Sequence, residues 1–289
     1  MEPLARIVAP VDFSERSAGA VRYASLLARH FRAELSLVHV FAPPPLEFGD
    51  GAGSDSVLSE LHRNRAAEVA KALDSFLTDE LADLSVRRIV LEGDTAHRVV
   101  EFAHQEHAGL IVMATHGYGP FRHFILGSNT AKVLHDADCP VWTGVHLEGA
   151  PAIAFAPFRS ILCALDLGPQ SRKTLEWAMG LQSEFAAQLT LVHATTSVGD
   201  NVETLALQWL TSMRDAAEGE LRRLRDETGA TAELVVESGD PAHVICSVAS
   251  RMQAELLVIG RGSAAGVFGR LRTNAYAIIR QSPCPVVSV

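Results

Sequence analysis

The chain has 289 residues, of which 48% are hydrophobic, so it can form one large or two ordinary domains, each with a sizeable core. Its formal net charge at pH 7 is −9, and its lysines and arginines are scattered rather than gathered in a stripe. We therefore expect neither nucleic acid nor an anionic membrane surface as a partner.

The first half alternates short apolar runs with segments of helical periodicity. Residues 6–11 (RIVAPV) predict a buried strand, and Ser14 is placed to cap the helix that follows. Further strands are predicted at residues 35–40, 86–91 and 110–113 and, opened by a proline, within 139–145. Helices are predicted between them, including one at residues 96–107 and a long one after a Pro- and Gly-rich segment at residues 43–56.

The second half repeats this order, which indicates a tandem duplication. Asp166 follows an apolar run 154 positions after Asp12, and Cys284 stands 145 positions after Cys139. We predict two domains, residues 1–148 and 157–289, with a junction near residue 150. Strands that alternate with helices are typical of a parallel, doubly wound sheet, which binds ligands beyond the carboxyl ends of its strands.

Residues 110–130 (LIVMATHGYGPFRHFILGSNT) combine a strand end, a glycine-rich turn and a helix start. Ser128, Asn129 and Thr130 lie where a helix N-terminus offers unpaired N–H groups to an anion. Glycines allow a close approach of the backbone, and hydroxyls can donate hydrogen bonds to phosphate oxygens. The alternative is an ordinary connection in which a serine caps the helix, and composition alone favours it.

This stretch resembles the ATP-binding signature of the universal stress protein family, G-x-x-G-x9-G-S/T. Gly117 and the pair Gly127 and Ser128 match the signature, whereas Ala114 replaces its first glycine. The resemblance extends over nearly the whole chain. It implies an α/β fold of two tandem doubly wound, Rossmann-like domains, each with five parallel strands in the order 3-2-1-4-5. It also implies that the fifth strands pair, so that the halves form an intramolecular pseudo-dimer.

By this resemblance, the first half binds ATP, with Mg as an optional companion. Asp12 and the Val11 backbone would meet the adenine and ribose, and the Val40 main chain would read the base edge. The expected nucleotide-binding residues are Pro10, Val11, Asp12, Val40, Met113, Ala114, His116, Gly117, Gly127, Ser128, Asn129 and Thr130. From the residues alone, Asp12 could equally brace the N-terminus of its own helix. Ala114 would cost about 1 kcal/mol or more if the site requires a positive φ, and almost nothing if φ is negative.

The second half departs from the signature. Nine residues after Gly262 it has Arg272 and Thr273, where the first half has a glycine and a serine. Because a long cationic side chain would fill the space that a triphosphate needs, we expect one nucleotide-binding half and one mainly structural half. Asp166 is then a relic of the site or a local helix cap.

The sequence favours an ATP-binding regulatory or stress-response protein over an enzyme. It has no P-loop, GxSxG or HExxH motif, and its spacing does not force Asp12, His116 and Arg122 into a catalytic arrangement, so no catalytic residue is expected. Two alternatives stay open. The chain could be a scaffold that has lost nucleotide binding and binds an apolar metabolite or a protein partner, or it could be a slow ATP hydrolase.

Cysteine usage and the first residues of the chain predict a cytoplasmic protein. The four cysteines form no CxxC pair, and nothing resembles a signal peptide or a membrane-spanning run. An unknown protein partner and a homodimer are both compatible with the sequence. No metal site is expected, because His104 and His107 share a helix face but supply only two ligands. His39 and His193 are expected to be core histidines bonded to backbone.

Overall fold

The computed structural model describes residues 4–42, 54–115, 126–144, 158–195, 204–261 and 270–289, with backbone alone for 54–59, 204–208 and 270–273. The expected domain junction and most of the Pro- and Gly-rich segment at residues 43–56 lie outside the described residues. The two domain boundaries therefore stay predictions.

The described strands and helices lie where the sequence predicts them. The first half contains β1 (Arg6–Pro10), α1 (Glu15–Phe31), β2 (Glu34–Phe41), α2 (Ser54–Ser75), β3 (Val86–Glu92), α3 (Thr95–Gln105), β4 (Leu110–Val112), α4 (Ser128–Asp136) and β5 (Val141–Thr143). The second half contains β6 (Ser160–Ala164), α5 (Ser171–Phe185), β7 (Gln188–Thr195), α6 (Thr204–Thr228), β8 (Glu233–Ser238), α7 (Pro241–Arg251), β9 (Leu256–Ile259), α8 (Arg270–Gln281) and β10 (Val286–Ser288).

The strands form one ten-stranded sheet in the order β3-β2-β1-β4-β5-β10-β9-β6-β7-β8. Each half thus has the predicted order 3-2-1-4-5 with parallel neighbours. The halves meet where β5 and β10 pair antiparallel, with Trp142 opposite Val287. We call this pair of strands the seam. It confirms the predicted pseudo-dimer within one chain.

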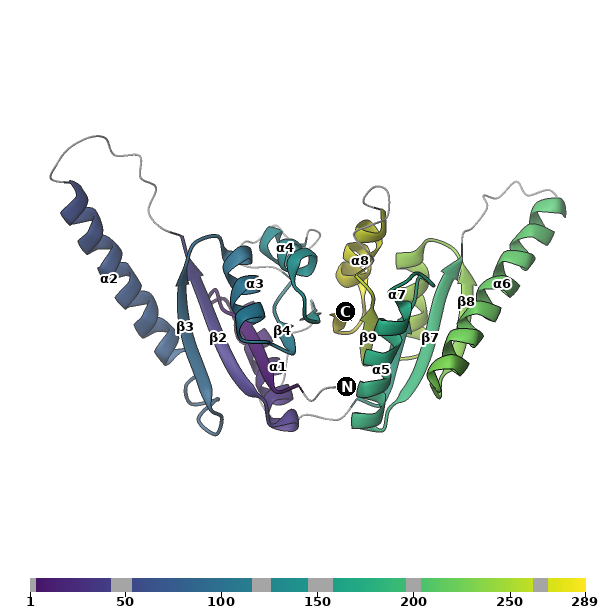
Figure 1. Ribbon diagram of the computed structural model, residues 1–289, viewed down its shortest axis with the longest axis horizontal. Helices are drawn as coiled ribbons and strands as arrows, with labels where there is room; N and C mark the ends of the chain where they lie inside the picture. Colours follow the sequence, from purple (N-terminus) through teal and green to yellow (C-terminus); the bar gives the residue numbers. More distant parts are fainter. Residues whose placement is uncertain (1–3, 43–53, 116–125, 145–157, 196–203, 262–269) are drawn as a thin grey trace.

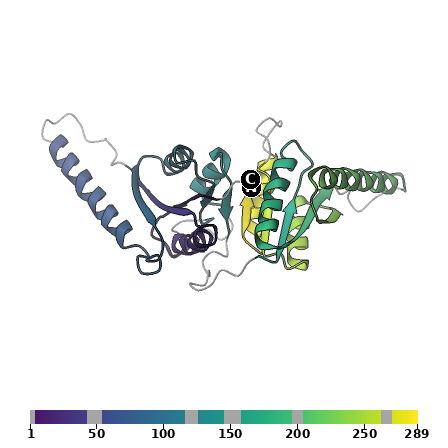
Figure 2. The same ribbon diagram turned by 60° about the horizontal axis from the view of Figure 1, so that its bottom comes forward.

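Helices cover both faces of the sheet (Figure 1). Because side chains alternate along a strand, Ile7 and Ala9 of β1 join one apolar core and Val8 joins the other. The first core contains residues of α1, α2, α5 and α6, and the second contains residues of α3, α4, α7 and α8. The two halves lie side by side, with α2 and α6 at opposite ends of the molecule (Figures 1 and 2).

Both cores run across the seam without interruption. On the face of α1 and α5, the fully buried Trp142 lies 5.3 Å from the Tyr23 ring and 5.6 Å from the Phe158 ring. Phe158 in turn contacts Phe185 edge to face at 5.2 Å. Aromatic pairs of this kind add to the free energy gained from buried area, so the seam is an apolar core and not a loose contact between domains.

No helix in the described part of the chain combines the length and the apolar character that a membrane crossing requires.

Candidate functional site

The expected adenosine-contacting residues gather at one edge of the sheet, where β1, β2 and β4 end. Pro10 closes β1, and the Val11 amide donates to the Val38 carbonyl at 2.8 Å. Val40 lies buried near the end of β2, and Met113 follows β4, buried, with its amide on the Trp142 carbonyl at 3.0 Å. The carboxyl ends of parallel strands share one edge, so the structure brings these residues together as the sequence predicts.

Asp12 directly follows this edge and is half-buried. Its Oδ1 accepts a hydrogen bond from the Ser14 amide at 3.0 Å and another from the Ser14 hydroxyl at 2.5 Å. Ser14 is the predicted N-cap of α1, because its Oγ accepts from the Ser17 amide. Asp12 therefore braces its own helix through Oδ1, while Oδ2 has no partner among the described residues and can still accept a hydrogen bond from a ligand hydroxyl.

The turn after Asp12 is held in an unusual backbone conformation. Phe13 has φ +63°, in the left-handed region that non-glycine residues rarely adopt. Its ring stacks on the His39 ring at 4.6 Å, and His39 Nδ1 lies 2.7 Å from the Val11 carbonyl oxygen. His39 is thus a histidine bonded to backbone, as predicted, and it fixes the main chain beside Asp12.

The helix start behind the predicted phosphate site has no side-chain cap. The N-cap of α4 is Gly127, with no side-chain hydrogen bond, and the first helical bond runs from the Ala131 amide to the Gly127 carbonyl at 2.8 Å. The amides of Ser128, Asn129 and Thr130 therefore have no partner within the helix. The serine-cap alternative is wrong, since Ser128 is the first helical residue and exposed. The arrangement suits an anion.

Two hydrogen bonds tie this helix start to the end of β4. The Gly127 amide donates to the Thr115 carbonyl at 2.9 Å, and the Thr130 hydroxyl donates to the Ala114 carbonyl at 3.1 Å. The Thr130 side chain is buried, so the contact it can offer a phosphate is its main-chain amide. His116 and Gly117, and also Arg122, lie outside the described residues.

Ala114 fits its position without backbone strain, because it is not among the described non-glycine residues with positive φ. The pairing of β4 with β1 in the first half has the same register as the pairing of β9 with β6 in the second half. By this register Ala114 corresponds to Gly260. A Cβ added to Gly260 would lie 3.0 Å from Thr174 Oγ1, and 154 positions before Thr174 the first half has Ala20. The smaller helix residue leaves room for the Ala114 methyl, a pairing that the sequence analysis missed.

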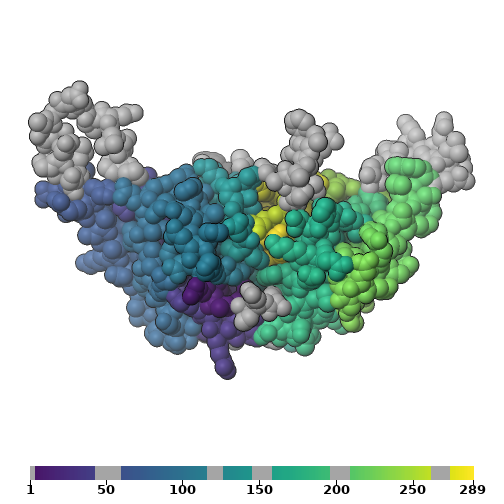
Figure 3. All heavy atoms as spheres, viewed as in Figure 1, coloured from purple at the N-terminus to yellow at the C-terminus, as the bar shows by residue number. Residues whose placement is uncertain are grey.

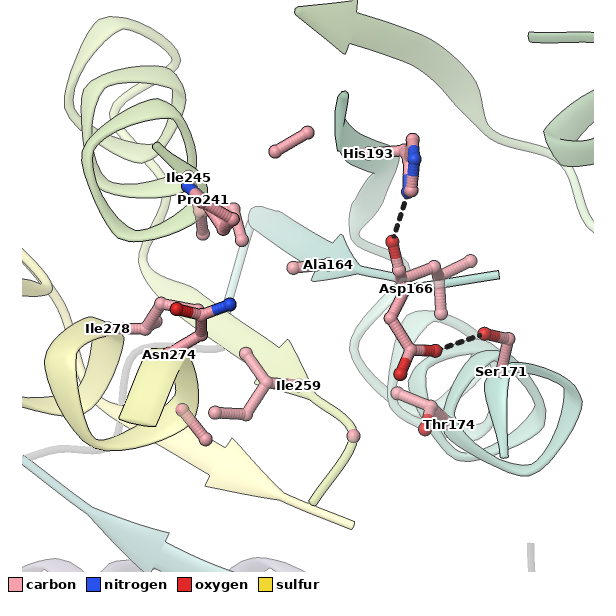
Figure 4. A pocket seen from close by; sticks show the side chains of 14 residues that line it. Ala164, Asp166, Ser171, Thr174, His193, Pro241, Ile245, Ile259, Asn274 and Ile278 are labelled. Carbon is pink, nitrogen blue, oxygen red and sulfur yellow. Dashed lines mark hydrogen bonds between the residues drawn. The ribbon is translucent and has the colours of Figure 1, made fainter. Parts of the chain in front are cut away.

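The second half has a pocket at the corresponding sheet edge, with a volume of about 190 Å³. Figure 4 shows Asp166, Ser171 and Thr174 on one side and Asn274 and Ile278 of α8 on the other. The lining is largely apolar. The volume lies below the range of about 300–1,000 Å³ that is usual for drug-sized ligands.

The predicted role of Asp166 as a helix cap is wrong, because the N-cap of α5 is Gln170 and has no side-chain hydrogen bond. Asp166 instead braces the turn that precedes this helix. Its Oδ1 accepts from the Gly168 amide at 2.8 Å and from the Ser171 hydroxyl at 3.0 Å. His193 Nδ1 lies 2.8 Å from the Leu165 carbonyl oxygen, so it too is bonded to backbone as predicted. The side chain of Arg272, expected to occupy the phosphate space, lies outside the described residues.

The other described histidines lie on or just after helices, and several lie beside carboxylates. His104 Nδ1 is 2.8 Å from Asp138 Oδ2, and His107 follows α3 with φ +51°. His97 and His243 are exposed first-turn residues whose amides bond the capping carboxylates at the starts of α3 and α7. Within the described ranges, no three His, Cys, Asp or Glu side chains gather in a group that could hold a metal ion.

Two doubly wound halves that pair through their fifth strands define a protein of two tandem α/β domains. A sequence model described as the universal stress protein family matches residues 4–143 and 157–289, and the chain belongs to that family. The resemblance read from its motifs is thereby confirmed.

Relatives match the chain both over its whole length and over one half. A universal stress protein of Mycolicibacterium smegmatis is 25% identical over 292 residues, which cover 98% of this chain and 96% of that protein. One of Methanocaldococcus jannaschii is 33% identical over 136 residues, which cover 47% of this chain and 79% of that protein. The crystal structure of a universal stress protein from Archaeoglobus fulgidus covers 98% of this chain and is itself covered to 95%, with a TM-score of 0.60 and 21% identity. That likeness shows the fold.

Proposed function

We propose that the first half binds ATP and that the bound nucleotide regulates the protein. The observation that carries this proposal is the uncapped N-terminus of α4, tied to the end of β4 beside the edge where Asp12 and Val40 lie. Anionic phosphates are stabilised by unpaired helix amides, and the Asp12 carboxylate can accept hydrogen bonds from ribose hydroxyls.

The proposed site combines all twelve residues expected from the sequence, but their roles differ. Ser128 and Asn129 offer amides and exposed polar side chains to the phosphates, with Mg as an optional companion, whereas Thr130 offers its amide. Pro10, Val11 and Met113 shape the adenosine end through backbone and packing. His116 and Gly117 belong to the proposal on their motif alone.

Calorimetric titration with MgATP tests this site, and the duplication supplies a matched control. Asp12→Ala should weaken ATP binding about tenfold, because hydrogen bonds to a charged group contribute about 1.5–3 kcal/mol. Asp166→Ala removes an equivalent brace from the second half and should leave ATP affinity unchanged. Absence of binding heat for the wild type, or equal losses in both variants, would reject ATP binding in the first half.

A regulatory role is more economical than catalysis. A ligand shifts a conformational equilibrium by its differential affinity for the two states, and no reacting group is required. A slow ATP hydrolase would instead need a positioned water and compensation of charge on the γ-phosphate. Phosphate release under saturating MgATP separates the two, since steady turnover that Asp12→Ala abolishes would favour the hydrolase.

The pocket of the second half supports a second candidate function, binding of a small and largely apolar molecule. Denaturing the purified protein and identifying the released compounds distinguishes the two ligands. An adenine nucleotide supports the first site, and a phosphate-free compound lost on Ile245→Trp supports the second. We also propose a cytoplasmic location, supported by four free cysteines, and a protein partner that reads the nucleotide state.

A further inference from the structure

A side chain of the second half crosses the seam and binds the helix that starts at the proposed phosphate site. Arg261, two residues after the end of β9, donates from Nη1 to the Ala137 carbonyl at 2.6 Å and to the Leu134 carbonyl at 3.4 Å. Its Nη2 donates to the Cys139 carbonyl at 2.8 Å. All three acceptors lie in the last turn of α4 or just beyond it.

The position of this guanidinium suits a helix C-terminus. The last carbonyls of a helix have no partner within it, and the macrodipole favours a cation there. Arg261 is half-buried, and burial lowers the pKa of its guanidinium, which nevertheless stays charged at any physiological pH. The planar fork satisfies three carbonyls at once, which a single ammonium group cannot do in this geometry.

A second side chain holds the same helix nearer its start. The Tyr276 hydroxyl of α8 donates to the Ala131 carbonyl at 3.1 Å. Ala131 comes directly after the three residues whose amides are open. In the space-filling view the teal surface around α4 adjoins the yellow surface of the C-terminal segment along the middle of the molecule (Figure 3).

We propose that Arg261 and Tyr276 are positioning residues for nucleotide binding in the other half, an inference that rests on the proposed function. They fix α4 from one side, while the bond from Thr130 to Ala114 fixes it from β4. Amides that bind phosphate must hold hydrogen-bond distances of about 3 Å, so a small shift of α4 weakens several contacts together. The second half thereby sets the affinity of the first.

The first half has shorter side chains at the positions that correspond to Arg261 and Tyr276. In the strand register Arg261 corresponds to Thr115, and Tyr276 stands 145 positions after Ala131, the spacing that also relates Cys139 to Cys284. Neither Thr115 nor Ala131 has a side chain long enough to reach α8 in the same way. The second half can therefore keep a functional role although its own glycine and serine are replaced.

Three variants of the full chain test the proposal. Arg261→Met keeps the aliphatic stem but removes every donor, and Arg261→Lys keeps the charge without the fork. Arg251→Met is the matched control, because Arg251 forms an exposed ion pair with Glu237 in the same half. Calorimetric ATP affinity should fall about tenfold for Arg261→Met, fall less for Arg261→Lys, and stay at the wild-type value for Arg251→Met. Wild-type affinity in Arg261→Met would overturn the proposal.

Hydrogen exchange of the α4 amides without nucleotide gives a readout that does not depend on ATP. Exchange should quicken in Arg261→Met and in the milder variant Tyr276→Phe, which should also bind ATP about threefold more weakly. If the wild type binds no ATP, the proposed function fails, and unchanged exchange in both variants would overturn the positioning role independently. Should Arg261→Met fail to fold, Tyr276→Phe decides by the same two measurements.

Discussion

Two small residues beneath the proposed site differ between the halves, and this difference gives a quantitative test of the equivalence of the two halves. In the first half Ala20 of α1 is fully buried and Ala114 lies at the end of β4, whereas the second half has Thr174 and Gly260 at these positions. Ala20→Thr should therefore reproduce in the first half the approach of 3.0 Å between a Cβ and a threonine hydroxyl oxygen. This approach is closer than an ordinary van der Waals contact.

The magnitude follows from the packing of the second half. Overpacking a core costs about 1–3 kcal/mol. Thr174 Oγ1 donates to the Gln170 carbonyl at 3.1 Å, and the corresponding carbonyl of Arg16 can accept from the new hydroxyl, so burial of the polar group adds little. We expect Ala20→Thr to lower the free energy of unfolding by about 1–2 kcal/mol.

A double-mutant cycle isolates the contact. Ala114→Gly alone should cost about 0.5–1 kcal/mol through chain entropy, but in the Ala20→Thr background it should restore stability, with a coupling of at least about 1 kcal/mol. The reverse cycle, Gly260→Ala with Thr174→Ala, should behave alike. Urea unfolding measures all four free energies in each cycle. Wild-type stability in Ala20→Thr, or a double variant no more stable than Ala20→Thr, would refute the assigned equivalence.

Three further predictions concern buried thiols, a helix cap and the seam. Burial raises the pKa of Cys139 and of Cys284 to about 11. Iodoacetamide at pH 8 should therefore label both thiols far more slowly than an exposed cysteine, and the labelling rate should increase towards pH 10. Rapid labelling at pH 8 would contradict this prediction. Hydrogen bonds from the His97 amide and Lys132 lower the pKa of Asp94, the N-cap of α3. Asp94→Ala should therefore lower the free energy of unfolding by its full amount at neutral pH and by almost nothing in acid, where the carboxylate of the wild type is protonated. Unfolding scans of both proteins measure this difference, and a deficit that persists in acid would contradict the capping role. Phe158→Ala should lower the free energy of unfolding by about 3–5 kcal/mol, because it removes a ring that packs on Trp142 and Phe185. Both halves should still unfold together in one cooperative urea transition. A separate transition for each half would show that the seam does not couple them.

The fold could be predicted from sequence because its signals are local and duplicated. Apolar runs mark the strands, Ser14 marks the start of α1, and the 154-position spacing of Asp12 and Asp166 fixes the repeat. The pairing of β5 with β10 came from the family resemblance, since nothing local in VWT or VVS specifies a partner strand.

The candidate site could be predicted only in part. Motif spacing located the start of α4 but not its capping residue, because Gly127 and Ser128 are both acceptable N-caps on propensity. The sequence allows Asp12 to brace its own helix or to bind a ligand, and its bonds to Ser14 confirm the brace, while its second carboxylate oxygen can still accept a bond from a ligand. The contacts of Arg261 could not be predicted from the sequence. Its acceptors are backbone carbonyls of the other half, and no residue type in the sequence marks such a partner.

Because β5 and β10 pair within one chain, the association of the two halves does not depend on protein concentration. Two separate subunits would part on dilution, but tethered halves meet at an effective concentration set by their connection, which commonly reaches the millimolar range. Every copy of the chain therefore contains one half of each kind in a fixed one-to-one ratio. The edges of β5 and β10 are already paired inside each chain, and β3 and β8 are the outermost strands of the sheet. Two whole chains would therefore have to associate through a surface other than the seam.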